Sequence, residues 1–370
     1  MIYLHVPFCH RKCTYCAFYS KPLHDGDAVG RYVDALLDEM ERRRGELAHP
    51  VRTVYFGGGT PSLLSTDRLG RIVEALRRCF DLSRLEEVTI ECNPEDLTPD
   101  FVDALWSMHF FNRLSIGIQS LDDAMLRLIG RRHTAAQALD AVRLVHSVGF
   151  RNISVDFIYG LPSSGPSPSA VGLDMHAFDF SLVTHVSAYA LTVEQGTALA
   201  AQVGQGRVAM PDEDEVVRQY HVLHDMLEAE GFCQYEVSNY ARQGFVSRHN
   251  SRYWDRTPYL GLGPGAHSFA LPAAGSSAAG GTRRWNNPDG TVGEEHLTEA
   301  DAVNELLMTA LRTTRGLPLA AVPERYRKRL HLAMQPYVDC GWMATDNDVW
   351  RPTAEGLLHA DGIAAALFVA

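Results

Sequence analysis

The chain has 370 residues, of which 46% are hydrophobic, so it can bury one large core and a smaller one. Its formal net charge of −11 excludes a protein that binds nucleic acid through bulk positive charge, and we expect no nucleic-acid partner. The sequence has no apolar stretch of about 18 residues and no secretory leader, so we expect no membrane span and a cytoplasmic location.

Strand-like and helix-like segments alternate over roughly the first 200 residues. We expect strands at residues 2–6, 53–56, 88–91, 113–119, 152–158 and 185–191. Between them, helical periodicity covers residues 28–44, 66–79, 101–108 and 134–148. This alternation predicts a parallel sheet with right-handed crossovers, either doubly wound or as a closed or partial barrel.

Polar and glycine-rich segments follow the ends of these strands. A cysteine-rich loop follows the first strand, Gly57-Gly58-Gly59 the second, and Glu91, Gln119 and Asp156 lie at or near the ends of later ones. In a barrel the carboxyl ends of the strands form one face, where the chemistry takes place. A doubly wound sheet would instead concentrate its signal in a G-x-G-x-x-G turn after the first strand, which is missing here. The pattern favours the barrel.

The later part of the chain changes character. Two segments, 163–169 and 270–281, have the Ser, Gly, Pro and Ala composition of surface loops. From about residue 294 we expect mainly helices, beginning with residues 299–311, and one hairpin at 342–351. We therefore divide the chain into a barrel domain (1–230), a linking segment (231–293) and a mainly helical, winged-helix-like C-terminal domain (294–370).

Cys9, Cys13 and Cys16 form a C-x3-C-x2-C pattern within one loop. Three thiolates can hold a cluster of four irons and leave one iron open to a small molecule. Two other interpretations stay open at this point, a zinc site completed by a histidine (His5, His10 or His24) and a chance group of thiols. The odd total of seven cysteines disfavours disulfides, and we expect the other four, Cys79, Cys92, Cys233 and Cys340, to be plain thiols.

Further candidates lie at the same face. Three consecutive glycines, 57–59, allow a ligand to approach the backbone closely, although a simple turn would also use them. Glu91 and Asp156 could bind a ribose diol, and Arg131 could pair with a carboxylate. Taken singly, each of these polar residues is more often structural.

The segment His249-Asn250-Ser251-Arg252-Tyr253-Trp254 gathers an imidazole, a phenol and an indole. Histidine and tyrosine both ligate haem iron, and aromatic rings suit a flat macrocycle. From the chemistry alone, an aromatic cluster that anchors a loop explains this segment better.

Taken together, these motifs resemble the radical S-adenosylmethionine superfamily. The loop from Cys9 to Cys16, with Tyr15 before the last cysteine, matches the cluster motif of that superfamily. Four further segments, at residues 3–9, 56–62, 115–120 and 156–162, resemble the branch that contains oxygen-independent coproporphyrinogen III oxidase and the HemW haem chaperones. The oxidase usually has a cysteine where this chain has Phe18, and the H-N-x-x-Y-W segment at 249–254 is a mark of HemW.

The resemblance implies a fold and a set of site residues. The fold is α/β, a partial (β/α)6 TIM-like barrel with a smaller C-terminal domain. Cys9, Cys13 and Cys16 would ligate a 4Fe-4S cluster. The residues around S-adenosylmethionine would be Tyr3, Tyr15, Gly58, Gly59, Thr60, Glu91, Gln119, Arg131, Asp156 and Ala190. With the family in view, haem binding at 249–254 becomes the favoured interpretation, with His249 as the first choice of iron ligand and Tyr253 as the second.

The implied function is that of a haem chaperone, which binds haem and delivers it to a haem-accepting respiratory protein. A one-electron reductant would serve the cluster, and the acceptor could bring the chain to a membrane surface. The alternative is the enzymatic conversion of coproporphyrinogen III to protoporphyrinogen IX, and the missing cysteine at Phe18 counts against it.

Overall fold

The computed structural model describes residues 1–23, 26–162, 175–272 and 279–370. The expected loop at 163–169 and the residue His24 lie outside these ranges, as does the middle of the expected loop at 270–281. Among the described residues, no helix combines the length and the hydrophobicity that crossing a bilayer requires.

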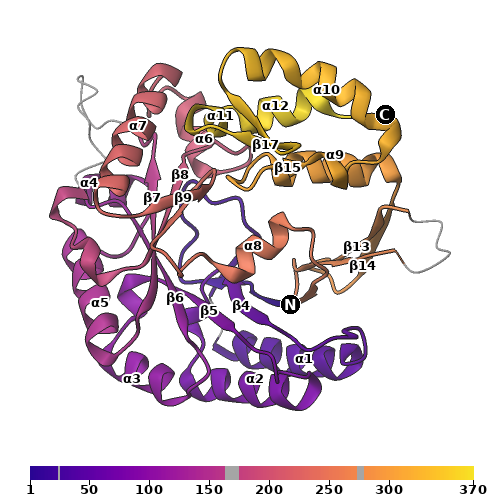
Figure 1. Cartoon of the computed structure of the whole chain (residues 1–370). Coiled ribbons are helices and arrows are strands. Elements are labelled where there is room, and N and C mark those ends of the chain that lie inside the picture. Colours follow the sequence, from indigo (N-terminus) through magenta and orange to yellow (C-terminus); the bar gives the residue numbers. More distant parts are fainter. Residues whose placement is uncertain (24–25, 163–174, 273–278) are drawn as a thin grey trace.

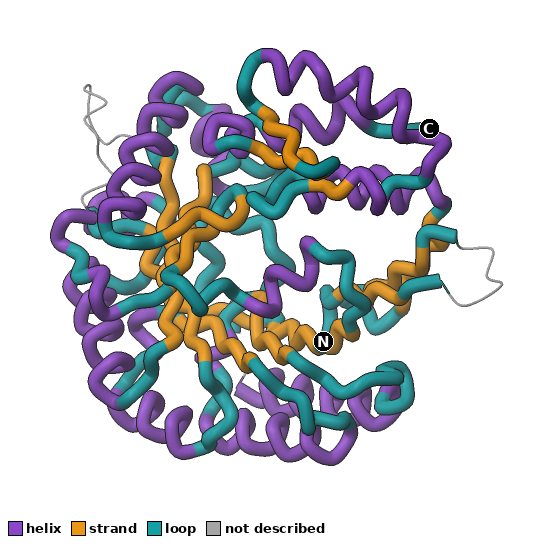
Figure 2. Tube along the Cα trace, viewed as in Figure 1, coloured by secondary structure: helices purple, strands orange, loops and turns teal. Residues whose placement is uncertain are grey.

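A nine-stranded sheet forms the body of the molecule. In spatial order its strands are β11 (Leu260–Leu262), β1 (Ile2–Val6), β4 (Thr53–Gly58), β5 (Glu87–Cys92), β6 (Arg113–Gln119), β7 (Asn152–Tyr159), β8 (His185–Ala190), β10 (Asn239–Ala241) and β9 (Cys233–Glu236). Strands β11 to β8 run parallel, and β10 and β9 add an antiparallel edge. The sheet curves without closing, which confirms the predicted partial barrel (Figure 2).

Helices cover the outer side of this curved sheet (Figure 1). They are α1 (Gly26–Arg43), α2 (Thr66–Cys79), α3 (Pro99–Ser107), α5 (Ala135–Val148) and α7 (Glu213–Ala229). Their starts follow local capping rules, since the Ser65 side chain accepts a hydrogen bond from the third residue of α2 and Thr134 forms a capping box with Gln137 at α5. Apolar residues on one face of each helix, such as Leu69 and Ile72 of α2, pack on the sheet. Two short helices, α4 (Asp123–Leu128) and α6 (Ala198–Gly204), contact the cysteine loop instead, since Ile129 after α4 and Leu199 of α6 hydrogen-bond to the backbone of Thr14.

Two short parallel strands, β2 (Phe8–Cys9) and β3 (Lys21–Pro22), frame the cysteine loop. Helix α8 (Arg248–Trp254) lies on the inner side of the sheet, where the barrel is open (Figure 1). A separate antiparallel sheet contains β12 (His267–Ala270), β13 (Gly281–Asn286) and β14 (Val292–Leu297).

The C-terminal region forms a second core of its own, which includes Leu307, Leu330, Trp350 and Leu367. Its elements are α9 (Glu299–Ala310), α10 (Glu324–Asp339), α11 (Ala354–Leu358), α12 (Ala360–Leu367) and a sheet of β15 (Leu317–Pro318), β16 (Met343–Asp346) and β17 (Val349–Pro352). Strands β16 and β17 are the predicted hairpin. Helices that flank a small antiparallel sheet agree with the expected winged-helix-like module.

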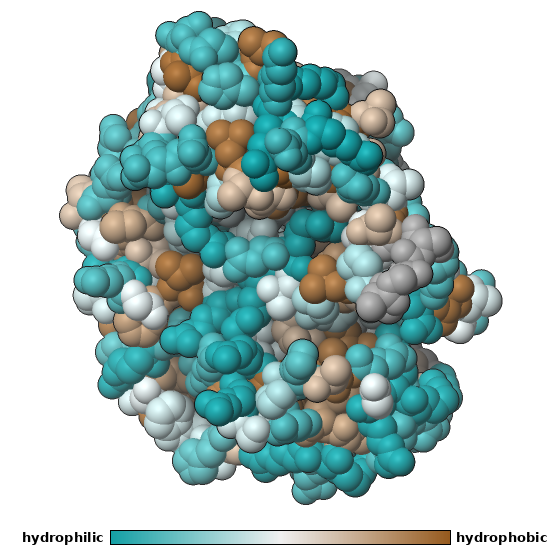
Figure 3. Space-filling model, turned by 45° about the vertical axis from the view of Figure 1, so that its right-hand side comes forward, coloured by the Kyte–Doolittle hydropathy of each residue, from teal (hydrophilic) through white to brown (hydrophobic). Residues whose placement is uncertain are grey.

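The outer surface on the side shown in Figure 3 is mostly hydrophilic, and hydrophobic residues are scattered over it rather than gathered in one patch. Such a surface is ordinary for a protein that faces water.

Candidate functional site

The carboxyl ends of the parallel strands surround a cavity of about 480 Å³, which is large enough for a nucleoside-sized ligand. Twelve of the fifteen site residues predicted from the sequence line it: Cys9, Cys13, Tyr15, Cys16, Gly58, Gly59, Thr60, Glu91, Gln119, Arg131, Asp156 and Ala190. The remaining three, Tyr3, His249 and Tyr253, do not line it. The barrel thus brings together residues that lie as far as 185 positions apart in the sequence, from Cys9 to Glu194.

The cysteine loop is fixed to the protein at both ends. The Leu23 amide donates to the Cys9 carbonyl (2.8 Å), and the Thr14 amide donates to the Ile129 carbonyl (3.0 Å). Two side chains also approach the sulfurs, since the Thr60 hydroxyl lies 3.5 Å from Cys9 Sγ and Arg131 Nη1 lies 3.7 Å from Cys13 Sγ. Both groups are hydrogen-bond donors that approach the sulfur atoms from the protein side.

The donor set fits an iron–sulfur cluster better than a single ion. Among the described residues, no three His, Cys, Asp or Glu side chains converge on one point, as a lone zinc ion would require. In a four-iron cluster each cysteine binds a different iron, so three thiols spread around one cavity match it. One of the histidines that could have completed a zinc site, His5, is committed elsewhere: its ring nitrogens lie 3.1 Å from the Tyr3 hydroxyl and 2.8 Å from the Tyr19 carbonyl.

The three glycines make room for protein atoms as well as for the cavity. A methyl group on Gly59 would overlap the Phe8 carbonyl, and one on Gly58 would lie 2.7 Å from the His5 ring. Gly58 also has a φ of 110°, which side chains rarely tolerate. Strand β4 can therefore press against the start of the cysteine loop only because these positions lack side chains.

Two acidic residues face the cavity from neighbouring parts of the sheet. Glu91 accepts hydrogen bonds from the Tyr55 hydroxyl (2.7 Å) and the Gly58 amide (3.2 Å). Burial raises the pKa of Glu91 to about 7, although the Tyr55 hydrogen bond opposes the rise. Burial also raises the pKa of Asp156, which accepts a hydrogen bond from Ser115 (3.3 Å). Two carboxyl groups with shifted pKa values in one cavity are typical of a ligand-binding site.

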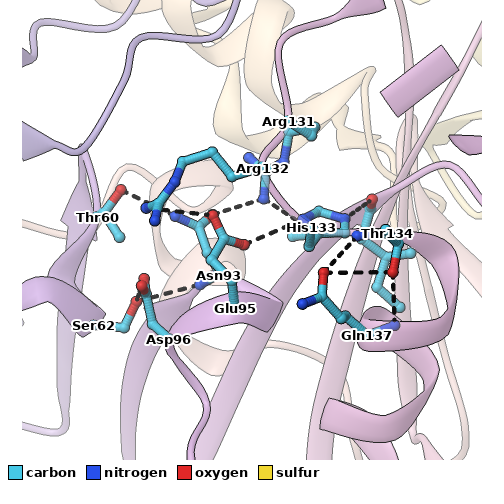
Figure 4. A network of polar contacts seen from close by, with 12 residues as sticks. Thr60, Ser62, Asn93, Glu95, Asp96, Arg131, Arg132, His133, Thr134 and Gln137 are labelled. Carbon is cyan, nitrogen blue, oxygen red and sulfur yellow. Dashed lines mark hydrogen bonds and ion pairs between the residues drawn. The ribbon is translucent and has the colours of Figure 1, made fainter. Parts of the chain in front are cut away.

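A polar network that the sequence analysis did not assign holds Arg131 in place (Figure 4). Arg131 Nη2 donates to the Asn93 side chain and to the Gly117 carbonyl, each at 2.7 Å, and Asn93 donates to Thr60 (3.2 Å). Behind them, His133 lies 3.2 Å from the Glu95 carboxylate and 3.0 Å from the Ile118 carbonyl. Asn93 follows directly after strand β5, so its position at a strand end was the signal that could have identified it.

Gln119 has a backbone conformation that the sequence did not suggest. Its φ of 71° lies in the left-handed region, and the pairing of β6 with β7 shifts register between Gly117 and Gln119. This bulge turns the end of β6 at the cavity wall. Non-glycine residues in such conformations cluster at functional sites.

Comparison with known proteins assigns this arrangement to a family. The model of the radical SAM superfamily matches residues 3–166, and the model of the HemN C-terminal domain matches residues 297–359. The haem chaperone HemW of Mycobacterium tuberculosis strain H37Rv is 36% identical, over 99% of this chain and 94% of its own length. The chain belongs to the HemW family. HemW of Lactococcus lactis is 34% identical, over 88% of this chain and 84% of its own length.

The fold of this HemW-family chain also matches a solved structure. The coproporphyrinogen III oxidase HemN of Escherichia coli superposes with a TM-score of 0.81, over 100% of this chain and 89% of that chain. The two sequences are only 21% identical, so this likeness establishes the shared fold and no more.

The HemW-type residues His249 and Tyr253 lie in α8, away from the cavity. The His249 side chain is fully buried, with Nδ1 2.9 Å from the Thr53 hydroxyl and Nε2 3.1 Å from the Tyr253 hydroxyl. Burial lowers the pKa of His249 to about 3, so the ring is neutral. Because both ring nitrogens have partners, binding of haem iron would first require α8 to move, and their role as iron ligands stays a prediction.

Tyr3 lies beneath the cavity rather than in its wall. Its ring stacks on Tyr55, with ring centres 6.0 Å apart, and its hydroxyl meets His5. Contact between Tyr3 and S-adenosylmethionine therefore also stays a prediction.

Proposed function

We propose that this chain binds haem and transfers it to an acceptor haem protein, with a 4Fe-4S cluster and S-adenosylmethionine at the cavity. The observation that carries the haem part is the similarity over nearly the full length to the M. tuberculosis protein, whose name is haem chaperone HemW. The cofactor part rests on the match to the radical SAM superfamily and on the three cysteines around one cavity.

The residues of the cavity suit these cofactors. Cys9, Cys13 and Cys16 would hold the cluster, which, when bound, supplies the single electron that the superfamily uses to cleave S-adenosylmethionine. Gly58 and Gly59 would admit the methionine end of the ligand, because they present backbone without side chains. Glu91 and Asp156 would accept hydrogen bonds from the ribose hydroxyls.

The remaining polar groups complete this pocket. Arg131 Nε is buried without a hydrogen-bond partner, which leaves one charged donor for a carboxylate. Gln119 and Ala190, at the ends of β6 and β8, would line the side of the pocket that holds the adenosine group. Tyr15 and Thr60 would line the pocket beside the cysteine loop. The proposal also includes an acceptor haem protein, a one-electron reductant for the cluster, association with a membrane surface through the acceptor, and a cytoplasmic location.

A haem titration tests the proposal. Protein reconstituted anaerobically with iron and sulfide should bind haem saturably and show a Soret band. Tyr253→Phe removes the hydroxyl that meets His249, and His249→Gln removes the imidazole, so we expect either change to shift or weaken the band if α8 provides the iron ligand. Tyr259→Phe, in a ring that packs edge-on against Tyr253 at 4.9 Å, is the matched control and should leave the band unchanged. A wild-type protein that takes up no haem would contradict the proposal.

The alternative oxidase activity needs its own assay. Phe18, which stands where the oxidase usually has a cysteine, is 71% exposed beside the cavity. We expect anaerobic incubation with coproporphyrinogen III, reductant and S-adenosylmethionine to yield no divinyl product. Formation of protoporphyrinogen IX would establish the enzymatic function instead.

A further inference from the structure

Arg113, the first residue of β6, is a buried charge that neither the cluster nor the cavity wall uses. Only 1% of it is exposed. Within the part of the chain that the structure describes, its guanidinium makes no hydrogen bond and no ion pair, and its buried Nε lacks any partner. Buried charges are normally paired, because desolvating an ion is costly. An unpaired buried arginine therefore points to a role outside packing.

The side chain of Arg113 belongs to the layer directly beneath the cavity. Side chains alternate along a strand, so Arg113 shares a face with Ser115 and Gly117, and both of these line the cavity. Arg113 pairs in register with Thr89 of β5 and Asn152 of β7. The side-chain oxygens of these two neighbours are also buried without partners. Three adjacent strands thus place an unsatisfied polar layer under the site.

The titratable groups on which the charge of Arg113 acts come from several elements around it. They are Tyr55 of β4, Glu91 of β5, Asp156 of β7, His185 of β8, Tyr235 of β9 and His249 of α8. Glu91 also interacts electrostatically with Tyr3 of β1, Tyr189 of β8 and Tyr253 of α8, and Asp156 interacts with Arg131 and Tyr189. The histidines already have partners, since His185 lies 2.8 Å from both Ser154 and Tyr235. The carboxyl groups are different, because burial favours their neutral form and the charge of Arg113 opposes it by lowering the pKa of both.

We propose that Arg113 is a positioning residue for the cavity: its unpaired charge favours the ionised form of the Glu91 and Asp156 carboxyl groups, so that their oxygens accept hydrogen bonds from the hydroxyl groups of a bound nucleoside. The inference rests on the proposed S-adenosylmethionine site. A direct ion pair would occupy further lone pairs of the carboxylate oxygens, whereas a charge one layer below acts through the low-dielectric interior and adds no further partner to them. Arg131, a cation that lines the cavity, is already bonded to Asn93 and the Gly117 carbonyl.

The test is the pH dependence of S-adenosylmethionine affinity, measured by equilibrium dialysis on the reconstituted protein. We expect wild-type affinity to fall as the pH drops through about 7, where Glu91 takes up a proton, and Glu91→Gln to remove that dependence. In Arg113→Met the midpoint should move up by about one pH unit, with about tenfold weaker binding near neutrality. Arg113→Lys keeps the charge and should keep the wild-type midpoint.

Several outcomes would overturn this role. One is a wild-type affinity for S-adenosylmethionine that does not change with pH. Another is a loss of affinity in Arg113→Met that is equal at every pH, which is the result expected if Arg113 has only a structural role. If Arg113→Met does not fold, Arg113→Gln replaces it in the same comparison with wild type. The pH dependence of the wild-type affinity is itself a test, because it needs no variant. A wild-type protein that binds no S-adenosylmethionine at any pH would instead refute the proposed cofactor site.

Discussion

Gly59 shows how a single residue decides whether the cysteine loop can sit at the cavity. Its amide donates to the Val6 carbonyl (2.7 Å), and its Cα faces the backbone of Phe8. The residue therefore joins the end of β4 to the turn that leads into Cys9. The sequence suggested that the glycines leave room for a ligand, and the structure adds that Gly59 leaves room for the backbone of Phe8.

We predict that Gly59→Ala destabilises the protein by about 1–3 kcal/mol, because the added methyl overlaps the Phe8 carbonyl and forces the loop outward. The displaced loop should also hold less iron after reconstitution. Denaturant unfolding and iron analysis measure the two effects. Gly70→Ala in α2 is the control, since no atom lies within 4 Å of the new methyl, and it should be neutral or slightly stabilising. Equal behaviour of the two variants would contradict this explanation.

Helix α8 is too short, at seven residues, to be stable alone, so tertiary contacts must hold it. The Glu87 carboxylate accepts hydrogen bonds from the first two amides of the helix, Arg248 (2.9 Å) and His249 (2.8 Å). Ser247 caps the same end by accepting from the Asn250 amide. The H-N-x-x-Y-W motif thus lies in a short helix that Glu87 and Ser247 anchor inside the open barrel.

Removing the cap should loosen this element selectively. We predict that Ser247→Ala lowers stability by about 1 kcal/mol, since one helix amide loses its partner. Hydrogen exchange should accelerate in residues 248–254 in particular. Ser65→Ala, which removes the corresponding cap of α2, should cost a similar amount and accelerate exchange in α2 instead. Unchanged exchange in α8 would show that other contacts alone hold it.

The element pattern explains what the sequence could predict. The six alternating strands of the barrel were predictable because buried parallel strands read as apolar runs, and β6 spans the expected residues. Strands β13 and β14 were missed because both of their faces are charged. Arg283 and Arg284 pair across the ladder with Glu295 and Glu294, so no apolar alternation marks them. The bulge at Gln119 and the buried contacts of His249 depend on tertiary packing, which no local pattern reveals.

At the scale of the whole molecule, ion pairs link the barrel to the C-terminal module near the end of α8. The barrel core and the C-terminal core are separate. Between them, Arg256 pairs with Glu305 (2.7 Å) and Arg315 pairs with Asp255 (2.8 Å). Residues that follow the buried α8 therefore contact the C-terminal module directly, and changes in α8 should affect the stability of the whole chain.

We predict that the stability of the whole protein depends on His249 between about pH 6.5 and pH 3. The lowered pKa of His249, about 3, means that the unfolded chain binds a proton that the folded chain excludes, so stability falls as the pH falls through this window. The effect is about 1.4 kcal/mol for each pKa unit. Denaturant titrations should therefore show a shallower decline for His249→Gln than for wild type.

Two features make this comparison clean. The pKa of Glu91 is raised to about 7, so this residue makes the protein less stable as the pH rises toward 7. Wild type and His249→Gln both retain Glu91, so its effect cancels in the comparison. The exposed His331, replaced by Gln, serves as the control and should follow the wild-type curve. Parallel declines in wild type and His249→Gln would refute the prediction.

The pairing of β1 with β11 has a consequence for biosynthesis. One edge of β1 joins β4 soon after both are made, but its other edge pairs with residues 260–262. A growing polypeptide must therefore carry an open, apolar strand edge through most of translation, and such edges invite wrong association. Because the metal-binding loop follows that same strand, its final shape depends on one of the last segments of the barrel to leave the ribosome.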